Sequence, residues 1–416
     1  MSPAPITKDP AAAGRRLQLT RAAHWFAGTQ GDPYALVLRA EAHDPSPYEE
    51  RIRAHGPLFH SELLDTWVTA SRTVADEVIA SAAFDGLTGD GRRPGERELP
   101  LSGTALDADR AAYHRLGALT AWGGTLMPAP HERALRESAE RHAQALLDGL
   151  ADSATAFDLA EAYARRLPAL VIREQLGVPQ ESAAAFDDAL AGCRRTLDGV
   201  LCPQLLPDAV ARARAEAELA AVLRESPFGH DADAVAAARA LALGAAEPTA
   251  TLVGNAVQAL LERPGQWAAL AQEPGLAAAA VTETLRVAPP VRLEWRVARE
   301  DTDVAGEHIP AGGRVVILVA AVNRPADAHT ADAAPFDLVR PEPGPFGLPG
   351  DLHFRLGGPL VRTVAEAALG ALGARLPGLH TAGRAVRRRR SPVLHGHARL
   401  PVAAARTTLD LPATAP

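Results

Sequence analysis

The sequence predicts a mainly α-helical protein with small β-sheets concentrated in its second half. Alanine-rich runs such as "AVAAARALALGAA" favour helices, because alanine has the lowest cost of any residue in a helix interior. Apolar residues recur with the helical period over 131–151 and 155–175. By contrast, "LEWRVA" and the stretches after it have the pattern of strands and turns. Because 47% of the 416 residues are apolar, a large core can be buried.

The individual elements follow from local signals. "DPYALVLRAEAHDPSPYEERIRAHGPL" predicts two helices separated by a proline-containing break, and "TWVTASR" predicts a short strand. The longest helix is expected from about Asp231 to Leu261, with a kink at Pro248, which lacks a backbone N–H. Another helix, "GLAAAAVTETLRV", should end before Pro289. "TDVAGEHIPAGGRVVILVAAVNR" and "SPVLHGHARLPV" then predict strands and turns.

The chain is expected to form one domain over residues 15–405. Residues 1–14 are rich in proline and alanine and are predicted to be disordered, and 406–416 are predicted to be a flexible tail. The net charge of −7 and the lack of a long basic block disfavour a nucleic-acid partner. No run of 18 apolar residues and no apolar signal core occur, so we expect no membrane span and a cytoplasmic location.

Several polar residues have ordinary structural interpretations. The only two cysteines, Cys193 and Cys202, are expected to be free thiols. The run Arg387–Arg390 predicts a solvated strand or loop, with an anion or partner site as the alternative. His395 and His397 are expected in a turn, because no third ligand lies nearby to complete a metal site. No metal is predicted.

Glu283 and Arg286 form an E-x-x-R pair on the helix before Pro289. At this spacing the two side chains share one helical face and can form an ion pair. We expect a buried structural pair that holds the helix to a loop.

The order of segments around this pair carries a family resemblance. "PPVRLEWRVARED", "GEHIPAGGRVVILVAAVNR" and "HFRLGGPLVR" follow the pair, while "MPAPHERALRES" and "EPTATLVGNAVQALLERPGQWAAL" precede it. Together they resemble the bacterial cytochrome P450 haem–thiolate monooxygenases, over residues 32 to 404. The resemblance implies the cytochrome P450 fold.

The haem site of that family is altered at its metal ligand. The position of the ligating cysteine is Arg355, whose protonated guanidinium has no lone pair for iron. Asp351 replaces a glycine of the preceding loop. His353 and Arg296 match the family's propionate-binding residues and are interpreted as remnants.

Two further positions depart from the family. The acid and threonine of the central helix are Glu247 and Pro248 here, and Thr249 lies one helical step, about 100°, away. On the haem-facing helix His131 is kept, but the arginine expected four residues later is Leu135. The resemblance therefore implies no catalytic residues and no bound cofactor.

Both ends of the chain resemble a haem-free branch of this fold. "GRRLQLTRAAHWFAGTQGDPYALVLRAE" and "AVRRRRSPVLHGHARLPV" look like segments of proteins that assist deoxysugar glycosyltransferases in macrolide and anthracycline antibiotic pathways. The resemblance implies that this chain binds and activates or stabilises such a glycosyltransferase. A homodimer within a heterotetramer is one assembly that this allows.

The partner-binding residues and the function have alternatives. His24, Trp25 and Phe26 are either an aromatic anchor for the partner or part of the core. The chain could instead be an atypical monooxygenase with His353 as ligand, or a haem-free enzyme in the remnant pocket. A sugar- or nucleotide-binding module that uses Arg355 at a helix N-terminus is the third alternative.

Overall fold

The computed structural model describes residues 10–41, 44–86, 110–120, 126, 131–151, 156–324, 335–339 and 358–404. Within these residues the α-helices are α1 (Pro10–Thr29), α2 (Pro33–Arg39), α3 (Ser46–Ala54), α4 (Arg72–Ala80), α5 (Arg110–Thr120), α6 (His131–Ala151), α7 (Arg166–Gln175), α8 (Ala183–Gly192), α9 (Asp198–Leu201), α10 (Leu206–Leu223), α11 (Ala232–Leu261), α12 (Pro264–Gln272), α13 (Ala277–Val287), α14 (Val319–Val322) and α15 (Gly358–Arg375). The mainly helical prediction is confirmed.

The strands form four small sheets. They are β1 (Phe59–Ser61), β2 (Thr66–Thr69), β3 (Phe84–Asp85), β4 (Phe157–Asp158), β5 (Leu293–Ala298), β6 (Thr302–Val304), β7 (Glu307–Ile309), β8 (Arg314–Leu318), β9 (Leu379–Thr381), β10 (Val386–Arg387), β11 (His397–Arg399) and β12 (Pro401–Ala404). The largest sheet has the order β1-β2-β8-β5-β3, in which only the pairing of β2 with β8 is parallel. The others are β4-β12-β9, β6-β7 and β10-β11.

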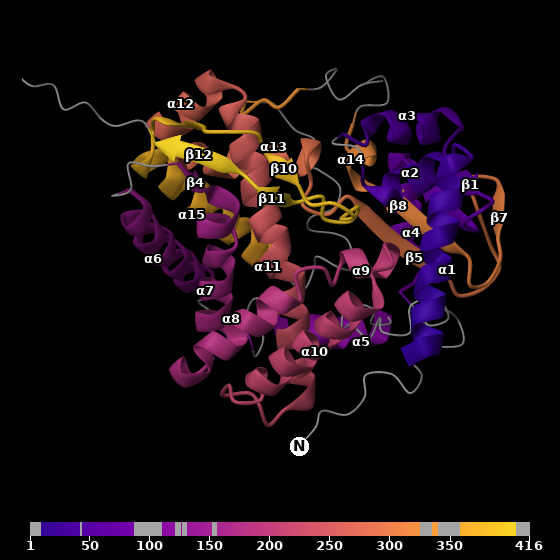
Figure 1. The fold of residues 1–416 in the computed structure, drawn as a ribbon, viewed down its shortest axis with the longest axis horizontal. Coiled ribbons are helices and arrows are strands. Elements are labelled where there is room, and N and C mark those ends of the chain that lie inside the picture. Colours follow the sequence, from indigo (N-terminus) through magenta and orange to yellow (C-terminus); the bar gives the residue numbers. More distant parts are fainter. Residues whose placement is uncertain are drawn as a thin grey trace, which may run out of the picture.

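The helices and the largest sheet occupy different parts of the molecule (Figure 1). Helices α1 to α4 lie with the five-stranded sheet on one side, and α6, α7, α12 and α15 lie on the other. Helix α11 runs through the helical part and is buried along most of its length. It contacts α15, α13, α5 and α7, so side chains near its middle are enclosed by several elements.

Two glycines let the C-terminal segment approach α11 closely. A Cβ atom at Gly254 of α11 would lie 2.8 Å from the Nδ1 atom of His397. A Cβ atom at Gly396 would lie 2.7 Å from the Oγ1 atom of Thr251. Both approaches are too close for any residue with a side chain, so glycine permits the contact that brings the arginine-rich segment to the centre of the fold.

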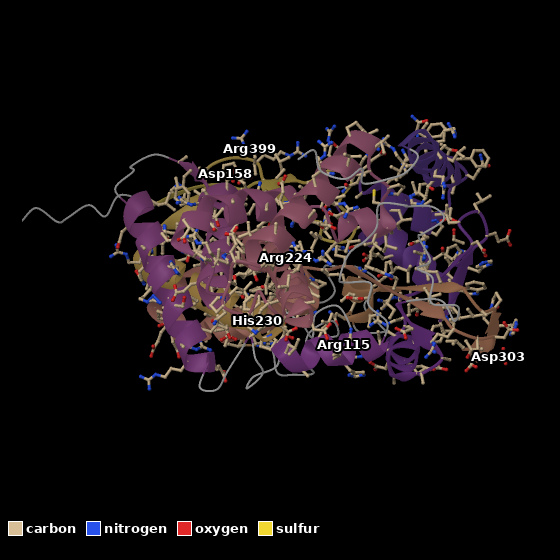
Figure 2. The ribbon with its side chains drawn as sticks, turned by 90° about the horizontal axis from the view of Figure 1, so that it is seen from below. Arg115, Asp158, Arg224, His230, Asp303 and Arg399 are labelled. Atoms are coloured by element: carbon tan, nitrogen blue, oxygen red, sulfur yellow. The ribbon has the colours of Figure 1, made fainter. Side chains whose placement is uncertain are left out.

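Two predictions from the sequence are wrong. Residues 10–14 are not disordered, because α1 begins at Pro10 and Ala13 is buried; residues 1–9 and 406–416 lie outside the described part. The helix expected over 155–175 is interrupted by β4 and a π-helical turn at Ala160–Ala164. The carboxylate of Asp158, labelled in Figure 2, accepts hydrogen bonds from the backbone N–H groups of Ala160 and Leu400, so pairing with the C-terminal strand overrides the helical pattern.

Candidate functional site

The E-x-x-R pair joins α13 to the segment 335–339. Arg286 donates two hydrogen bonds to the carboxylate of Glu283, at 2.9 and 2.6 Å, and both side chains are buried. The same guanidinium donates to the carbonyl of Pro335 at 3.2 Å, and the backbone N–H of Asp337 donates to Glu283 at 3.0 Å. The predicted buried, structural pair is therefore present, and it connects α13 to the backbone at Pro335 and Asp337.

The hydroxyl group nearest the altered position of α11 is already bonded. Thr249 is fully buried, and its Oγ1 atom donates a hydrogen bond to the carbonyl of Ala245 at 2.7 Å. This is the carbonyl four residues earlier on the same helix, which a buried threonine commonly uses. Pro248 lies inside the helix and contributes no N–H. The hydroxyl at 249 therefore serves the helix backbone.

Glu247 is surrounded by arginines from three other segments. Its carboxylate lies 2.8 Å from Arg388 and 3.5 Å from the Nε atoms of both Arg165 and Arg194. The side chains of Glu247, Arg165 and Arg388 are about one-tenth exposed or less. Burial lowers the pKa of Arg388, but the Glu247 carboxylate outweighs this and raises it above its usual value. The geometry is that of a structural charge cluster rather than an acid open to solvent.

The prediction that Arg387–Arg390 is solvated is wrong for its first two residues. Arg388 bonds Glu247, and Arg387 donates to the side-chain oxygens of Asn255 and Gln258 on α11, at 2.5 and 2.9 Å. Burial, followed by the charge of Arg292, lowers the pKa of Arg387 to about 10. Arg389 and Arg390 are exposed. Partners more than 120 residues away explain the burial, which a local reading of four arginines does not reveal.

The prediction that both neighbouring histidines lie in a turn is wrong, because the turn ends before His395 and His397 is part of strand β11. A turn precedes His395, and His397 on β11 lies with its Nε2 atom 2.6 Å from the side-chain oxygen of Gln258. No group of three metal-ligating side chains occurs among the described residues. Cys193 and Cys202 are buried free thiols, and burial raises the pKa of each to about 12.

The other residues interpreted from the sequence as remnants of a haem site are only partly described. Arg296 on β5 is fully buried and donates to the carbonyl of Trp295 at 2.6 Å and to Glu294 at 3.3 Å. Its Nε atom and second terminal nitrogen have no hydrogen-bond partner among the described residues. His353 and Arg355 lie outside the described residues, and the side chain of His131, the first residue of α6, is likewise not described.

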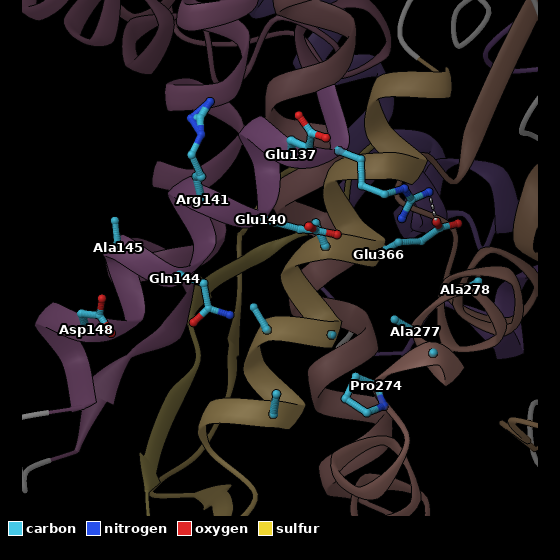
Figure 3. A pocket seen from close by; sticks show the side chains of 16 residues that line it. Glu137, Glu140, Arg141, Gln144, Ala145, Asp148, Pro274, Ala277, Ala278 and Glu366 are labelled. Carbon is cyan, nitrogen blue, oxygen red and sulfur yellow. Dashed lines mark hydrogen bonds and ion pairs between the residues drawn. The ribbon is translucent and has the colours of Figure 1, made fainter. Parts of the chain in front are cut away.

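Two further residues of helix α6, Leu135 and Arg136, contact the rest of the protein. Leu135 is fully buried. Arg136 points to α15, where it pairs with Glu366 at 3.1 Å. Both residues line a groove of about 1040 Å³ between α6 and α15 (Figure 3), whose lining also includes the small residues Gly370 and Ala371. The groove walls carry charges of both signs, among them Glu140 and Arg141.

The aromatic residues of α1 point outward. Trp25 is 58% exposed and Phe26 is 52% exposed, so the alternative that they form core is wrong. Leu19, one heptad before Phe26, is 70% exposed and extends the same apolar face. His24 is half-buried, and burial, with a further contribution from Arg314, lowers its pKa to about 4. None of the described helices is long and apolar enough to cross a membrane.

Comparisons with known proteins agree with this architecture. The family model described as Cytochrome P450 matches residues 255–344. Protein TylM3 of Streptomyces fradiae is 57% identical over 402 residues, 95% of this chain and 94% of that protein. Cytochrome P450 family protein EryCII of Saccharopolyspora erythraea is 35% identical over 95% of this chain and 99% of its own length. The ligand-free structure of Mycobacterium smegmatis CYP164A2 matches with a TM-score of 0.75 and 28% identity, over 89% of this chain and 99% of that one. The chain belongs to the cytochrome P450 family.

Proposed function

We propose that this chain is a non-catalytic member of the cytochrome P450 family that binds a deoxysugar glycosyltransferase of a macrolide or anthracycline type antibiotic pathway and activates or stabilises it. Both proteins act in the cytoplasm in this proposal, and a homodimer of the chain within a heterotetramer is compatible with it. The terminal segments that resemble the haem-free branch support the partner class. Relatives that match over nearly their full length support a role that needs the whole fold.

The observation that carries the non-catalytic part is the rearranged centre of α11. The acid, Glu247, is held by three arginines, and the Thr249 hydroxyl is bonded to its own helix. Neither group is available to move a proton to a bound ligand. The protein's donor set also does not fit a haem held by a thiolate, because Arg355 stands in the ligand position and offers no lone pair.

One observation favours the alternative of an atypical haem protein. Arg296 keeps two buried nitrogens without partners among the described residues, and a buried cation of this kind suits a carboxylate ligand such as a propionate. An absorption spectrum distinguishes the two functions.

The purified protein, expressed with haem precursor, is expected to show no Soret band. R355C alone is expected to give no oxygenase turnover with redox partners present, because the proline at 248 and the bonded hydroxyl of Thr249 remain. Stoichiometric haem in the unmodified chain, with a carbon monoxide difference peak, would contradict the proposal.

The partner is proposed to dock on the exposed apolar face of α1 that contains Leu19, Trp25 and Phe26, with His24 at its edge. The helix has three arginines and no acidic residue, in a chain whose net charge is −7, so it offers a locally basic, apolar surface. Aromatic residues beside arginines are typical of the energetic centres of interfaces.

W25A and F26A are each expected to weaken the complex with the co-expressed glycosyltransferase by about 2 kcal/mol, roughly thirtyfold in dissociation constant. V386A is a matched control, because Val386 is 44% exposed on β10, well away from α1 in Figure 1. Point substitutions are preferable to deletion of α1, because the opposite face of this helix packs Leu17 against Ala209.

Equal solubility and activity of the glycosyltransferase without this chain, and no complex on gel filtration, would refute the proposed function.

A further inference from the structure

A small pocket opens beside the exposed face of α1. It has a volume of about 240 Å³ and is lined by Arg21, His24 and Trp25 of α1, by Arg39 at the end of α2, by Cys202, and by Arg390 after β10. Pockets for small molecules usually measure roughly 300–1,000 Å³. The size therefore suits a single side chain better than a sugar nucleotide.

The charges around this pocket are not balanced. Arg39 is paired with Glu41 at 2.7 Å, and both line the pocket. The guanidinium groups of Arg21 and Arg390 form no ion pair or hydrogen bond with any of the described residues. Burial, followed by the charge of Arg390, lowers the pKa of Arg21, which indicates that the two cations repel each other; Asp208 offsets this in part.

The other titratable groups of the pocket do not neutralise these cations. The pKa of His24, lowered to about 4 by burial and then by Arg314, makes its imidazole neutral at pH 7. The pKa of Cys202, raised to about 12 by burial and then by Asp198, keeps this thiol protonated. Three arginines, Arg21, Arg39 and Arg390, therefore line the pocket with a single carboxylate, Glu41, which is paired with Arg39.

Arg390 also has an unfavourable backbone conformation. Its φ is +52°, in the left-handed region that residues other than glycine rarely adopt. Residues kept in such conformations concentrate at functional sites, where the strain is tolerated for the position that it gives a side chain. Arg390 lies in a turn, and its side chain lines the pocket beside Arg21 and Cys202.

We propose that this pocket receives a carboxylate side chain, an aspartate or glutamate of the glycosyltransferase, between Arg21 and Arg390 and against the ring of Trp25. The inference rests on the proposed function and adds the chemistry of the contact. A carboxylate at this point would relieve the repulsion of the two guanidinium groups and receive charge-assisted hydrogen bonds from both.

Charge reversal tests the pocket in the complex. R21E and R390E are each expected to raise the dissociation constant for the co-expressed glycosyltransferase at least tenfold. R399E is the matched control, since Arg399 is exposed on β11, away from α1 (Figures 1 and 2), and is expected to leave the constant within twofold. A complex that forms normally and tolerates both reversals would overturn the pocket proposal while leaving the proposed function intact.

Crosslinking identifies the partner group directly. Lys8 is the only lysine of the chain, so R21K in a K8R background introduces a single lysine amine at the pocket and keeps its charge. A zero-length carbodiimide reagent is expected to join this amine to an aspartate or glutamate of the glycosyltransferase, as read by mass spectrometry. Crosslinks from the chain's N-terminal amine alone would count against the proposal.

The free chain provides a test that does not need the partner. R390G is expected to melt at or above the temperature of the unmodified chain, because it removes both the strained φ and the repulsion of Arg21. A clearly lower melting temperature would show that Arg390 serves the fold and would overturn the pocket proposal. Absence of any complex with the unmodified chain would instead refute the proposed function.

Discussion

Replacement of Glu283 by alanine is expected to lower the free energy of unfolding by about 3–5 kcal/mol. The carboxylate of Glu283 accepts two hydrogen bonds from Arg286 and one from the backbone of Asp337. The substitution would leave a guanidinium whose side chain is only 8% exposed without its counter-charge, and it would release the segment 335–339 from α13. Urea denaturation, monitored by tryptophan fluorescence, measures this loss of unfolding free energy.

An exposed ion pair is the matched control for this experiment. Arg72 and Asp76 lie 2.9 Å apart on α4 and are about half exposed, so D76A is expected to cost only about 0.3–0.5 kcal/mol. The double variant E283L/R286M should recover part of the stability, because it removes both charges together. A loss below 1 kcal/mol in E283A would contradict a structural role for the pair.

Local sequence signals were sufficient where neighbouring residues decide the structure. The long central helix was predicted from about Asp231 to Leu261 and extends from Ala232 to Leu261. The side chain of Asp231 accepts hydrogen bonds from two N–H groups of its first turn, so the helix start is a local capping event. The E-x-x-R pair was also predictable, because both residues lie one turn apart on the same helix.

Signals that depend on distant residues were not visible. Arg388 is buried and Arg387 is partly buried, because Glu247, Asn255 and Gln258 of α11 bind their guanidinium groups. Nothing within four consecutive arginines indicates this. In α1 the sequence left open whether the aromatic residues form core or surface. The helical spacing could have indicated that Leu17 and Phe26 lie on different faces, but only the tertiary structure determines which face is covered.

Replacement of Glu247 by glutamine is expected to be as costly as the loss of Glu283, about 3–5 kcal/mol in the free energy of unfolding. The substitution keeps the size of the side chain and removes its charge. Arg388, Arg165 and Arg194 would then converge on a neutral group, with Glu161 as the remaining carboxylate paired with Arg165 and Arg194. Burial already lowers the pKa of Arg165, with smaller contributions from Arg388 and Arg194, whereas the charge of Glu247 raises it. Loss of the Glu247 charge would therefore destabilise the charged form of Arg165 further.

Glu262, which follows the last residue of α11, provides an exposed carboxylate as the control for Glu247. Glu262, at the end of α11, is 54% exposed and lies 3.8 Å from Arg263, so E262Q is expected to cost less than about 1 kcal/mol. The double variant E247Q/R388Q should regain part of the stability, since it removes one of the uncompensated cations. If Glu247 were instead kept for proton transfer, E247Q would unfold at the same urea concentration as the unmodified chain. Unchanged unfolding would therefore remove the main support for a non-catalytic central helix and favour the remnant-pocket enzyme.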